Sequence, residues 1–214
     1  MFRITLGPAA TSKQTGTQIM GHRNRTSTVA SLAVVAAVAT LATLGATPTG
    51  ERPTSGAPQK LAPYAPTPQD VVEKMLEIAN VTSSDVVYDL GSGDGRLVIT
   101  AAKKHGARGV GVEIDPALVA ESRANAKKAG VESLVEFREQ DALKADVSPA
   151  TVVTLYLLNE GNLKLRPTLQ TTLRPGARVV SHQFGMGSWQ PTRTETFTDS
   201  LGANRTIYLW QIGK

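Results

Sequence analysis

A glycine-rich stretch directly after a short apolar run constrains this chain more than any other feature. Residues 85–90 (DVVYDL) lead into the run Gly91-Ser92-Gly93-Asp94-Gly95. Glycine permits a tight turn and lets a ligand approach the backbone where a side chain would collide. A short apolar run that ends in such a turn and continues into a helical pattern predicts a buried strand, a turn and a helix. We therefore expect a ligand at this strand end.

The rest of the chain alternates between strand and helix patterns. Strands are predicted at residues 85–90, 109–114, 134–138, 151–157 and 177–181, and helices at 96–105, 116–129 and around Leu169 and Leu173. A further helix is expected to begin at Thr67 as its N-cap, and residues 193–198 and 205–212 alternate as a closing antiparallel hairpin. Such alternation predicts an α/β fold with a mostly parallel sheet covered on both faces. Ligands of such sheets bind beyond the carboxyl ends of the strands.

Charge and composition exclude several classes of protein. The net charge is +5, but residues 1–50 carry four basic residues and no acid, whereas residues 51–214 carry 19 basic and 18 acidic residues. The body is therefore nearly neutral, and we expect no nucleic-acid partner. The chain has no cysteine, which excludes disulfides, thiolate metal sites and a cysteine nucleophile. We expect no metal site, and we expect a monomer.

The first sixty residues differ from the rest in composition. We divide the chain into a basic leader (1–28), an apolar segment (29–46), a proline-rich disordered linker (47–62) and a folded domain (63–214). The apolar segment has the pattern of a secretory signal peptide and the length of a short membrane anchor. We expect a domain that is membrane-associated or exported. A leader without acids also fits a mitochondrial transit peptide, which would place the domain in the matrix or at the inner membrane.

Acidic residues lie at the ends of the first three predicted strands. Asp89 precedes the glycine run, and a dinucleotide fingerprint would place its third glycine where Arg96 stands. An acid beside the turn suits a positively charged ligand better than a pyrophosphate. Glu113 ends the second strand, where a carboxylate accepts hydrogen bonds from ribose hydroxyls. The third strand leads into Gln140 and Asp141, where an amide or acid suits an adenine amino group.

These residues resemble the class I S-adenosylmethionine-dependent methyltransferases over most of residues 64–214. Residues 63–68 (PYAPTP) and 86–96 (VVYDLGSGDGR) look like the small protein-lysine methyltransferases of mitochondria and their bacterial relatives, although Ala65 stands where a larger aliphatic residue is expected. Those enzymes act on the ATP synthase c subunit and the adenine nucleotide translocase. The resemblance implies a Rossmann-like three-layer sandwich, S-adenosylmethionine as cofactor and a lysine of a protein as acceptor.

Positions at the strand ends, together with the resemblance, give candidate site residues. The predicted cofactor-binding residues are Tyr64, Thr67, Asp89, Gly91, Ser92, Gly93, Gly95, Glu113, Ile114, Asp115, Gln140 and Asp141, with Tyr64 and Thr67 folding over the cofactor. The predicted catalytic residues follow the fourth strand: Tyr156, Asn159 and Glu160. His182, Phe184, Met186 and Trp189 follow the fifth strand and are expected to wall the acceptor channel.

Two other functions stay open at this point. One is an oxidoreductase that uses a nicotinamide dinucleotide, which Arg96 disfavours. The other is a membrane-tethered or exported binding module that kept the fold without catalysis.

Overall fold

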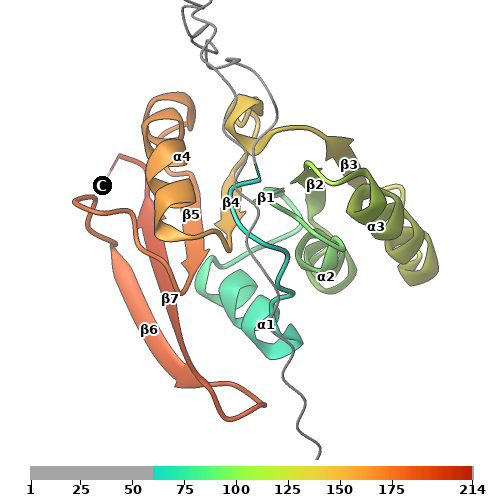
Figure 1. Ribbon diagram of the computed structural model, residues 1–214, viewed down its shortest axis with the longest axis horizontal. Coiled ribbons are helices and arrows are strands. Elements are labelled where there is room, and N and C mark those ends of the chain that lie inside the picture. The colour runs from blue at the N-terminus through green and yellow to red at the C-terminus, as the bar shows by residue number, and fades with distance from the viewer. Residues whose placement is uncertain (1–59, 214) are drawn as a thin grey trace, which may run out of the picture. The chain divides into compact units, whose positions relative to one another are not determined.

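The computed structural model describes residues 60–213, which form one seven-stranded sheet with helices on both faces (Figure 1). The strands lie in the order β3-β2-β1-β4-β5-β7-β6. Strands β1 to β5 are parallel, and the hairpin β6–β7 adds two antiparallel strands at the edge beside β5. The strands are β1 (Val86–Leu90), β2 (Arg108–Glu113), β3 (Val135–Glu139), β4 (Val152–Leu155), β5 (Arg178–His182), β6 (Arg193–Thr198) and β7 (Asn204–Gln211).

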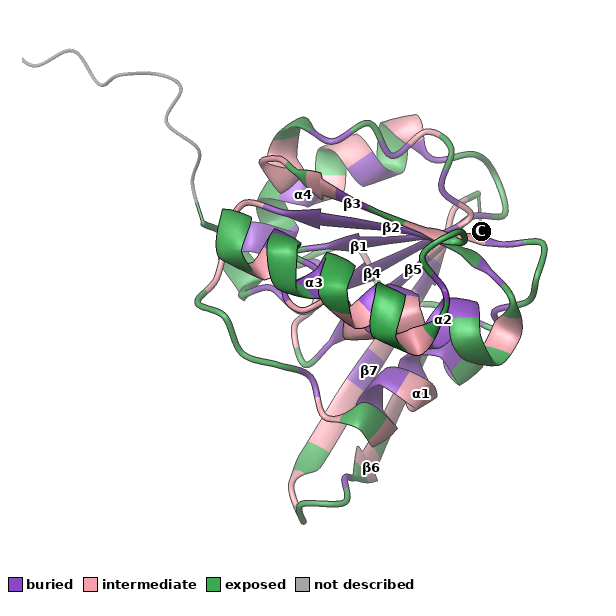
Figure 2. Ribbon diagram, turned by 90° about the vertical axis from the view of Figure 1, so that its right-hand side faces the viewer, coloured by how far each residue is buried: buried purple, intermediate pink, exposed green. Residues whose placement is uncertain are grey.

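The helices divide the structure into three layers. Helices α1 (Gln69–Ile78), α2 (Arg96–His105) and α3 (Pro116–Ala129) cover one face, and α4 (Asn159–Thr172) covers the other together with the short 3-10 helix η1 (Ala142–Lys144) (Figures 1 and 2). Successive strand residues point to opposite faces. In β1, Val87 joins the cluster under α1–α3, whereas Tyr88 and Leu90 join the cluster under α4.

This architecture confirms the predicted fold class, and α2 and α3 begin and end at the predicted residues. The start of the first helix was predicted wrongly. Pro68 occupies the N-cap position, and no side chain caps the helix. Thr67 instead is buried, and its carbonyl oxygen accepts a hydrogen bond from Arg96 Nη1 at 2.8 Å. A residue before proline is held in extended conformation, so Thr67 belongs to the segment that precedes the helix.

Several predictions concern residues outside those described. The basic leader (1–28), the apolar segment (29–46) and all but the end of the linker (47–62) are among them. Leu61 and Ala62, which the sequence placed in the linker, pack against the cluster under α4. Between residues 60 and 213, none of the helices is long and apolar enough to cross a membrane.

A buried ion pair ties the ends of the sheet opposite the glycine turn. Asp85 lies just before β1 and is 5% exposed, and its Oδ1 pairs with Arg178 at the start of β5. Thr151 Oγ1 and the Thr82 amide also donate to this carboxylate, at 2.7 and 2.8 Å. Burial opposes the charge, but these three donors hold the pKa of Asp85 below its usual value. The pair therefore stabilises the fold above the pH at which Asp85 titrates in the unfolded chain.

We predict that Arg178→Met lowers the free energy of unfolding by about 3 kcal/mol at pH 7, because it leaves a buried carboxylate without its cation. Urea unfolding followed by circular dichroism measures the change. Arg108→Met is the matched control: Arg108 is exposed at the start of the neighbouring strand, and its loss should cost less than about 0.5 kcal/mol. Equal losses for the two variants would contradict a stabilising role of the pair.

Candidate active site

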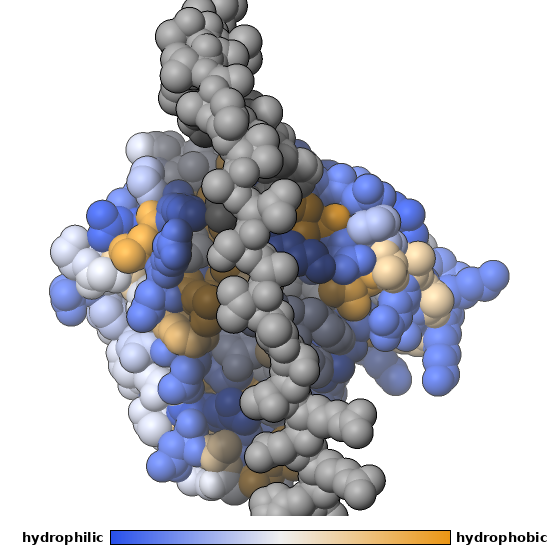
Figure 3. Space-filling view, in the orientation of Figure 1, coloured by the Kyte–Doolittle hydropathy of each residue, from blue (hydrophilic) through white to orange (hydrophobic). Residues whose placement is uncertain are grey.

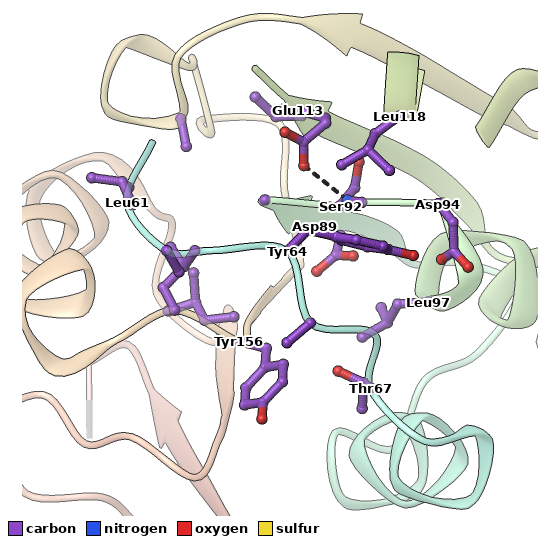
Figure 4. A pocket seen from close by; sticks show the side chains of 18 of the residues that line it. Leu61, Tyr64, Thr67, Asp89, Ser92, Asp94, Leu97, Glu113, Leu118 and Tyr156 are labelled. Carbon is purple, nitrogen blue, oxygen red and sulfur yellow. Dashed lines mark hydrogen bonds between the residues drawn. The ribbon is translucent and has the colours of Figure 1, made fainter. Parts of the chain in front are cut away.

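A pocket opens at the carboxyl ends of β1, β2 and β4, under the segment of residues 60–67, which we call the strap (Figure 4). This is where the strand order reverses, since β1 lies between β2 and β4. Ten of the predicted site residues line it: Tyr64, Thr67, Asp89, Gly91, Ser92, Gly93, Glu113, Ile114, Gln140 and Tyr156. The sheet therefore brings together residues from the carboxyl ends of four strands, β1 to β4, and from the strap.

Asp89 lies at the floor of this pocket. It is 7% exposed, and its Oδ1 accepts a hydrogen bond from Thr154 Oγ1 at 2.8 Å. The two residues are neighbours because the parallel register of β1 and β4 places Asp89 opposite Thr154. Burial raises the pKa of Asp89 to about 7, with the charges of Glu113 and Asp94 adding to the effect. Half of the carboxyl groups are thus protonated near neutral pH, and a cation in the pocket would favour the ionised form.

The glycine turn holds Glu113 at the edge of the pocket. Gly91 and Ser92 donate their amides to Val112 O at 2.8 and 3.0 Å, which fixes the turn against the end of β2. Glu113 Oε2 accepts from the Gly93 amide at 2.9 Å, the bond drawn in Figure 4. Its Oε1 accepts from the two amides that follow it, at 2.8 and 2.9 Å. The carboxylate is fixed in orientation before any ligand binds.

Ser92 also lines this pocket, and its hydroxyl makes no hydrogen bond within residues 60–213. The residue is 5% exposed. A Cβ atom on Gly111 would stand 2.7 Å from this hydroxyl oxygen, so the close approach of the turn to β2 requires glycine there.

The strap crosses the glycine turn and is tied down on both sides of it. The Tyr64 ring packs on Gly93, where a Cβ atom would stand 2.6 Å from Tyr64 Cε2. Arg96 bonds Thr67 O at one end of the strap and pairs with Asp94 at 2.6 Å. At the other end, Lys60 pairs with Asp115 at 2.8 Å. A ligand in the pocket is therefore covered by the strap.

Three of the predicted cofactor-binding residues have other contacts. Gly95 does not line the pocket; its φ of +81° and the Phe137 ring, 2.6 Å from a would-be Cβ, show why glycine is needed there. Asp115 Oδ1 caps α3 by accepting from the Ala117 amide, and Asp141 Oδ1 caps η1 by accepting from the Leu143 amide. Neither carboxylate lines the pocket, whereas Gln140, next to Asp141, does.

The predicted catalytic residues separate into two places. Tyr156 lines the pocket, and its ring lies 4.0 Å from that of His182 and 6.2 Å from that of Phe184, centroid to centroid. We call these three rings the aromatic wall. Asn159 and Glu160 are exposed in the first turn of α4 and do not line the pocket, and Glu160 pairs with Lys164 at 2.9 Å.

His182, Met186 and Trp189, which were also expected to wall the acceptor channel, lie in different surroundings. His182 is fully buried, and burial, with the nearby Arg205 adding to it, lowers its pKa to about 4. The imidazole is therefore neutral at physiological pH. Met186 is buried in the cluster under α4, and Trp189 packs on Trp210 with ring centroids 5.6 Å apart, so both belong to the core.

Sequence reasoning missed Thr154, Arg96 and Leu61 as parts of the site. Thr154 stands in the middle of a predicted buried strand, where a polar residue is itself a signal that it has a polar partner. Arg96 entered the sequence argument only because it stands where the dinucleotide fingerprint has its third glycine. Leu61 lines the pocket although it follows a proline-rich stretch, and no local pattern marks it.

The arrangement suits a ligand with a cationic group and a ribose. Three polar groups lie around the glycine turn: the buried Asp89 carboxyl with its raised pKa, the fixed Glu113 carboxylate and the Ser92 hydroxyl, which is unpartnered within the described residues. The turn itself presents backbone rather than side chains to a ligand. Beside them Tyr156, Leu155 and Leu157 line the same pocket.

Known proteins share this fold and this pocket-forming region. Residues 89–193 match the model of the ANTKMT methyltransferase domain. A protein-lysine N-methyltransferase of Saccharolobus islandicus is 46% identical over 71% of this chain and 94% of its own length. The adenine nucleotide translocase lysine N-methyltransferase of Mus musculus is 36% identical, but the match covers 60% of this chain and 56% of the mouse protein.

A solved structure of a similar protein contains S-adenosyl-L-homocysteine. The crystal structure of an RNA methyltransferase from Salinibacter ruber in complex with S-adenosyl-L-homocysteine is 60% identical. It matches 69% of this chain and 94% of that one with a TM-score of 0.65. These relatives favour neither the nicotinamide oxidoreductase nor the module without catalysis. The chain belongs to the class I S-adenosylmethionine-dependent methyltransferases, in the family of the ANTKMT methyltransferase domain, and S-adenosylmethionine is its cofactor.

Proposed function

We propose that this enzyme transfers a methyl group from S-adenosylmethionine to the side-chain amine of a lysine in a protein. The observation that carries the proposal is the 46% identity to the Saccharolobus islandicus protein-lysine N-methyltransferase, which extends over 94% of that enzyme. The aromatic and apolar lining on the Tyr156 side of the pocket supports it, because a long amine side chain with an apolar stem fits such a lining.

We propose distinct roles for the residues on the cofactor side. Asp89 would hold the ammonium of the methionyl group, Glu113 the ribose hydroxyls, and Gln140 with Ile114 the adenine. Ser92 and Gly93 would contact the cofactor through the backbone of the turn, and Tyr64 would cover it. When bound, the cofactor supplies an electrophilic methyl group on a sulfonium, so the protein need not activate a leaving group.

The acceptor amine must lose its proton before it can attack. With a reference pKa of about 10.4, that loss costs roughly 4–5 kcal/mol at pH 7. An environment that excludes water disfavours the ammonium and lowers the cost. Tyr156 contributes a ring face that is compatible with the amine and with the methylated product. Alignment of the two reacting groups then supplies most of the rate enhancement.

RNA methylation is a second candidate, because the Salinibacter ruber structure is described as an RNA methyltransferase. The charge of this chain favours a protein acceptor. Residues 60–213 carry 17 Lys and Arg residues and 17 Asp and Glu residues. Many of the cations are neutralised in ion pairs, including Lys60, Lys104 and Arg138. Nucleic-acid binding depends on cations that are available to phosphates.

We predict that the full-length enzyme labels a protein band when it is incubated with methyl-labelled S-adenosylmethionine and a lysate divided into membrane, soluble protein and RNA fractions. Amino-acid analysis of the band should recover the label as methyl-lysine. Asp89→Asn serves as the matched inactive control. Label in RNA alone would replace the lysine acceptor with a nucleotide, and label in no fraction would contradict the proposal.

The raised pKa of Asp89 predicts a pH-dependent affinity. The ammonium of the cofactor favours the ionised carboxyl, so binding weakens as Asp89 is protonated below pH 7. We expect the Kd for S-adenosylhomocysteine, measured by calorimetry, to be about tenfold higher at pH 6 than at pH 8. Asp89→Asn should bind weakly at both pH values.

In the absence of ligand, Asp89→Asn should be more stable than the wild type. Because the pKa of Asp89 is raised in the folded state, its contribution to stability is full below the unfolded pKa and is lost as the pH rises through about 7. At pH 8 the variant should therefore unfold at a higher urea concentration than the wild type. A pH-independent Kd in the wild type would contradict the proposed role.

The variants Tyr156→Phe and Glu160→Gln test whether each of these two predicted catalytic residues contributes to turnover. Tyr156 lines the pocket, and we expect loss of its hydroxyl to lower kcat about tenfold while the Kd for S-adenosylhomocysteine stays unchanged. Glu160 lies outside the pocket, so its substitution should lower kcat by less. Single-turnover transfer to the labelled acceptor measures both. Unchanged turnover in both variants would remove these residues from the reaction.

A further inference from the structure

A buried asparagine on α4 joins this helix to the loop that follows β5. Asn162 is fully buried, and its Nδ2 lies 3.0 Å from both Ser181 Oγ and Phe184 O. A longer contact of 3.4 Å joins it to Gly185 O. Ser181 is also fully buried and donates its hydroxyl to Phe184 O at 2.6 Å. The backbone carbonyl of Phe184 thus has two buried donors, which fix its position.

The loop needs such a restraint because its conformation is unfavourable. Gln183 has a φ of +67°, in the left-handed region that non-glycine residues rarely adopt. Its amide donates to Thr206 O at 2.7 Å, and the Phe184 amide donates to His182 O at 2.8 Å, which closes a tight turn. Strained backbone of this kind persists only where surrounding contacts hold it.

The turn places Phe184 in the aromatic wall. The Phe184 and Tyr156 rings are stacked at 24°, with centroids 6.2 Å apart, and Tyr156 lines the pocket. His182, which precedes the turn, packs against Tyr156 with centroids 4.0 Å apart. Any movement of the turn therefore displaces the rings that contact Tyr156.

We propose that Asn162 is a positioning residue for methyl transfer: it acts through the Phe184 carbonyl to hold the aromatic wall at the acceptor side of the pocket. The inference rests on the proposed function only for the identity of the acceptor. Asn162 lies outside the glycine turn, and its contacts are on the α4 side of the sheet. Misplacement of a group beside the reacting atoms by about 1 Å lowers turnover as much as 100-fold without loss of cofactor binding.

The same helix offers a matched control. Arg166 stands one turn after Asn162, and its Nη1 bonds Met186 O at 3.0 Å and Ser188 Oγ at 3.1 Å. It therefore ties the same loop to α4 at the far end, beyond Phe184. Arg166→Met should leave turnover close to that of the wild type.

The test is a double-mutant cycle between Asn162→Ala and Phe184→Ala in the full-length enzyme. The acceptor is whichever fraction, protein or RNA, takes label from the wild type. We expect each single variant to lower kcat/KM for the acceptor about tenfold or more, with an unchanged Kd for S-adenosylhomocysteine. Because Asn162 holds the loop that carries Phe184, the loss in the double variant should be smaller than the two single losses combined.

Additive losses in the cycle would overturn the proposal, as would unchanged turnover in Asn162→Ala or an equal loss in Arg166→Met. If Asn162→Ala does not fold, Ser181→Ala removes the other donor to Phe184 O and takes its place in the cycle. Bound S-adenosylhomocysteine shows that each variant is folded.

A second readout separates this inference from the proposed function. The chain has three histidines, and the His182 ring lies close enough to Tyr156 for its ¹H NMR resonances to be shifted by the aromatic ring. Asn162→Ala should move these resonances, and Arg166→Met should not. If the wild type labels neither protein nor RNA, the proposed function fails and the spectra alone decide: unmoved His182 resonances in Asn162→Ala would overturn the inference.

Discussion

The site depends on one buried contact, the hydrogen bond between Asp89 and Thr154 at the point where the strand order reverses. Two parallel strands in register place the pair side by side at the carboxyl ends of β1 and β4. Ionising a buried carboxyl costs free energy because the charge loses its hydration, and this cost is the reason that the pKa of Asp89 is raised. The glycine turn that follows Asp89 is bonded to Val112 O at the end of β2, and the strap lines the same pocket. A cationic ligand relieves the cost, so binding and folding are coupled at this residue.

The two sides of the pocket are held by different means. On the cofactor side, backbone amides fix the Glu113 carboxylate, and the turn is pinned to β2 by bonds to Val112 O. On the acceptor side, the Tyr156 ring is held by stacking and by a strained turn that buried side chains restrain. Figure 3 shows apolar surface beside hydrophilic surface on the face drawn in Figure 1, and Leu158 and Leu163 of the α4 region are exposed. Backbone hydrogen bonds therefore hold the cofactor side, whereas ring contacts and buried side chains hold the other side.

Local patterns predicted the parts of the fold that local interactions determine. Helices α2 and α3 begin and end at the predicted residues because glycine and proline mark both boundaries. The glycine turn was predicted for the same reason. The predicted residues whose contacts differ from expectation have short polar side chains, which serve equally well as ligands and as helix caps. Asp115 and Asp141 cap α3 and η1 instead of facing the pocket, and Thr67 does not cap α1.

Contacts between distant segments explain what the sequence did not reveal. Thr154 reaches Asp89 across 65 positions, and Asn162 reaches Ser181 across 19, so only the register of the sheet and the packing of α4 bring them together. The same division bears on specificity. Relatives described as acting on lysine and on RNA both match most of this domain. The cofactor side cannot distinguish such acceptors, since it is already occupied by groups that suit the cofactor. On the acceptor side that we propose, built by Tyr156, α4 and the loop after β5, changes in packing would move an aromatic ring without disturbing the glycine turn, so we expect discrimination to come from there.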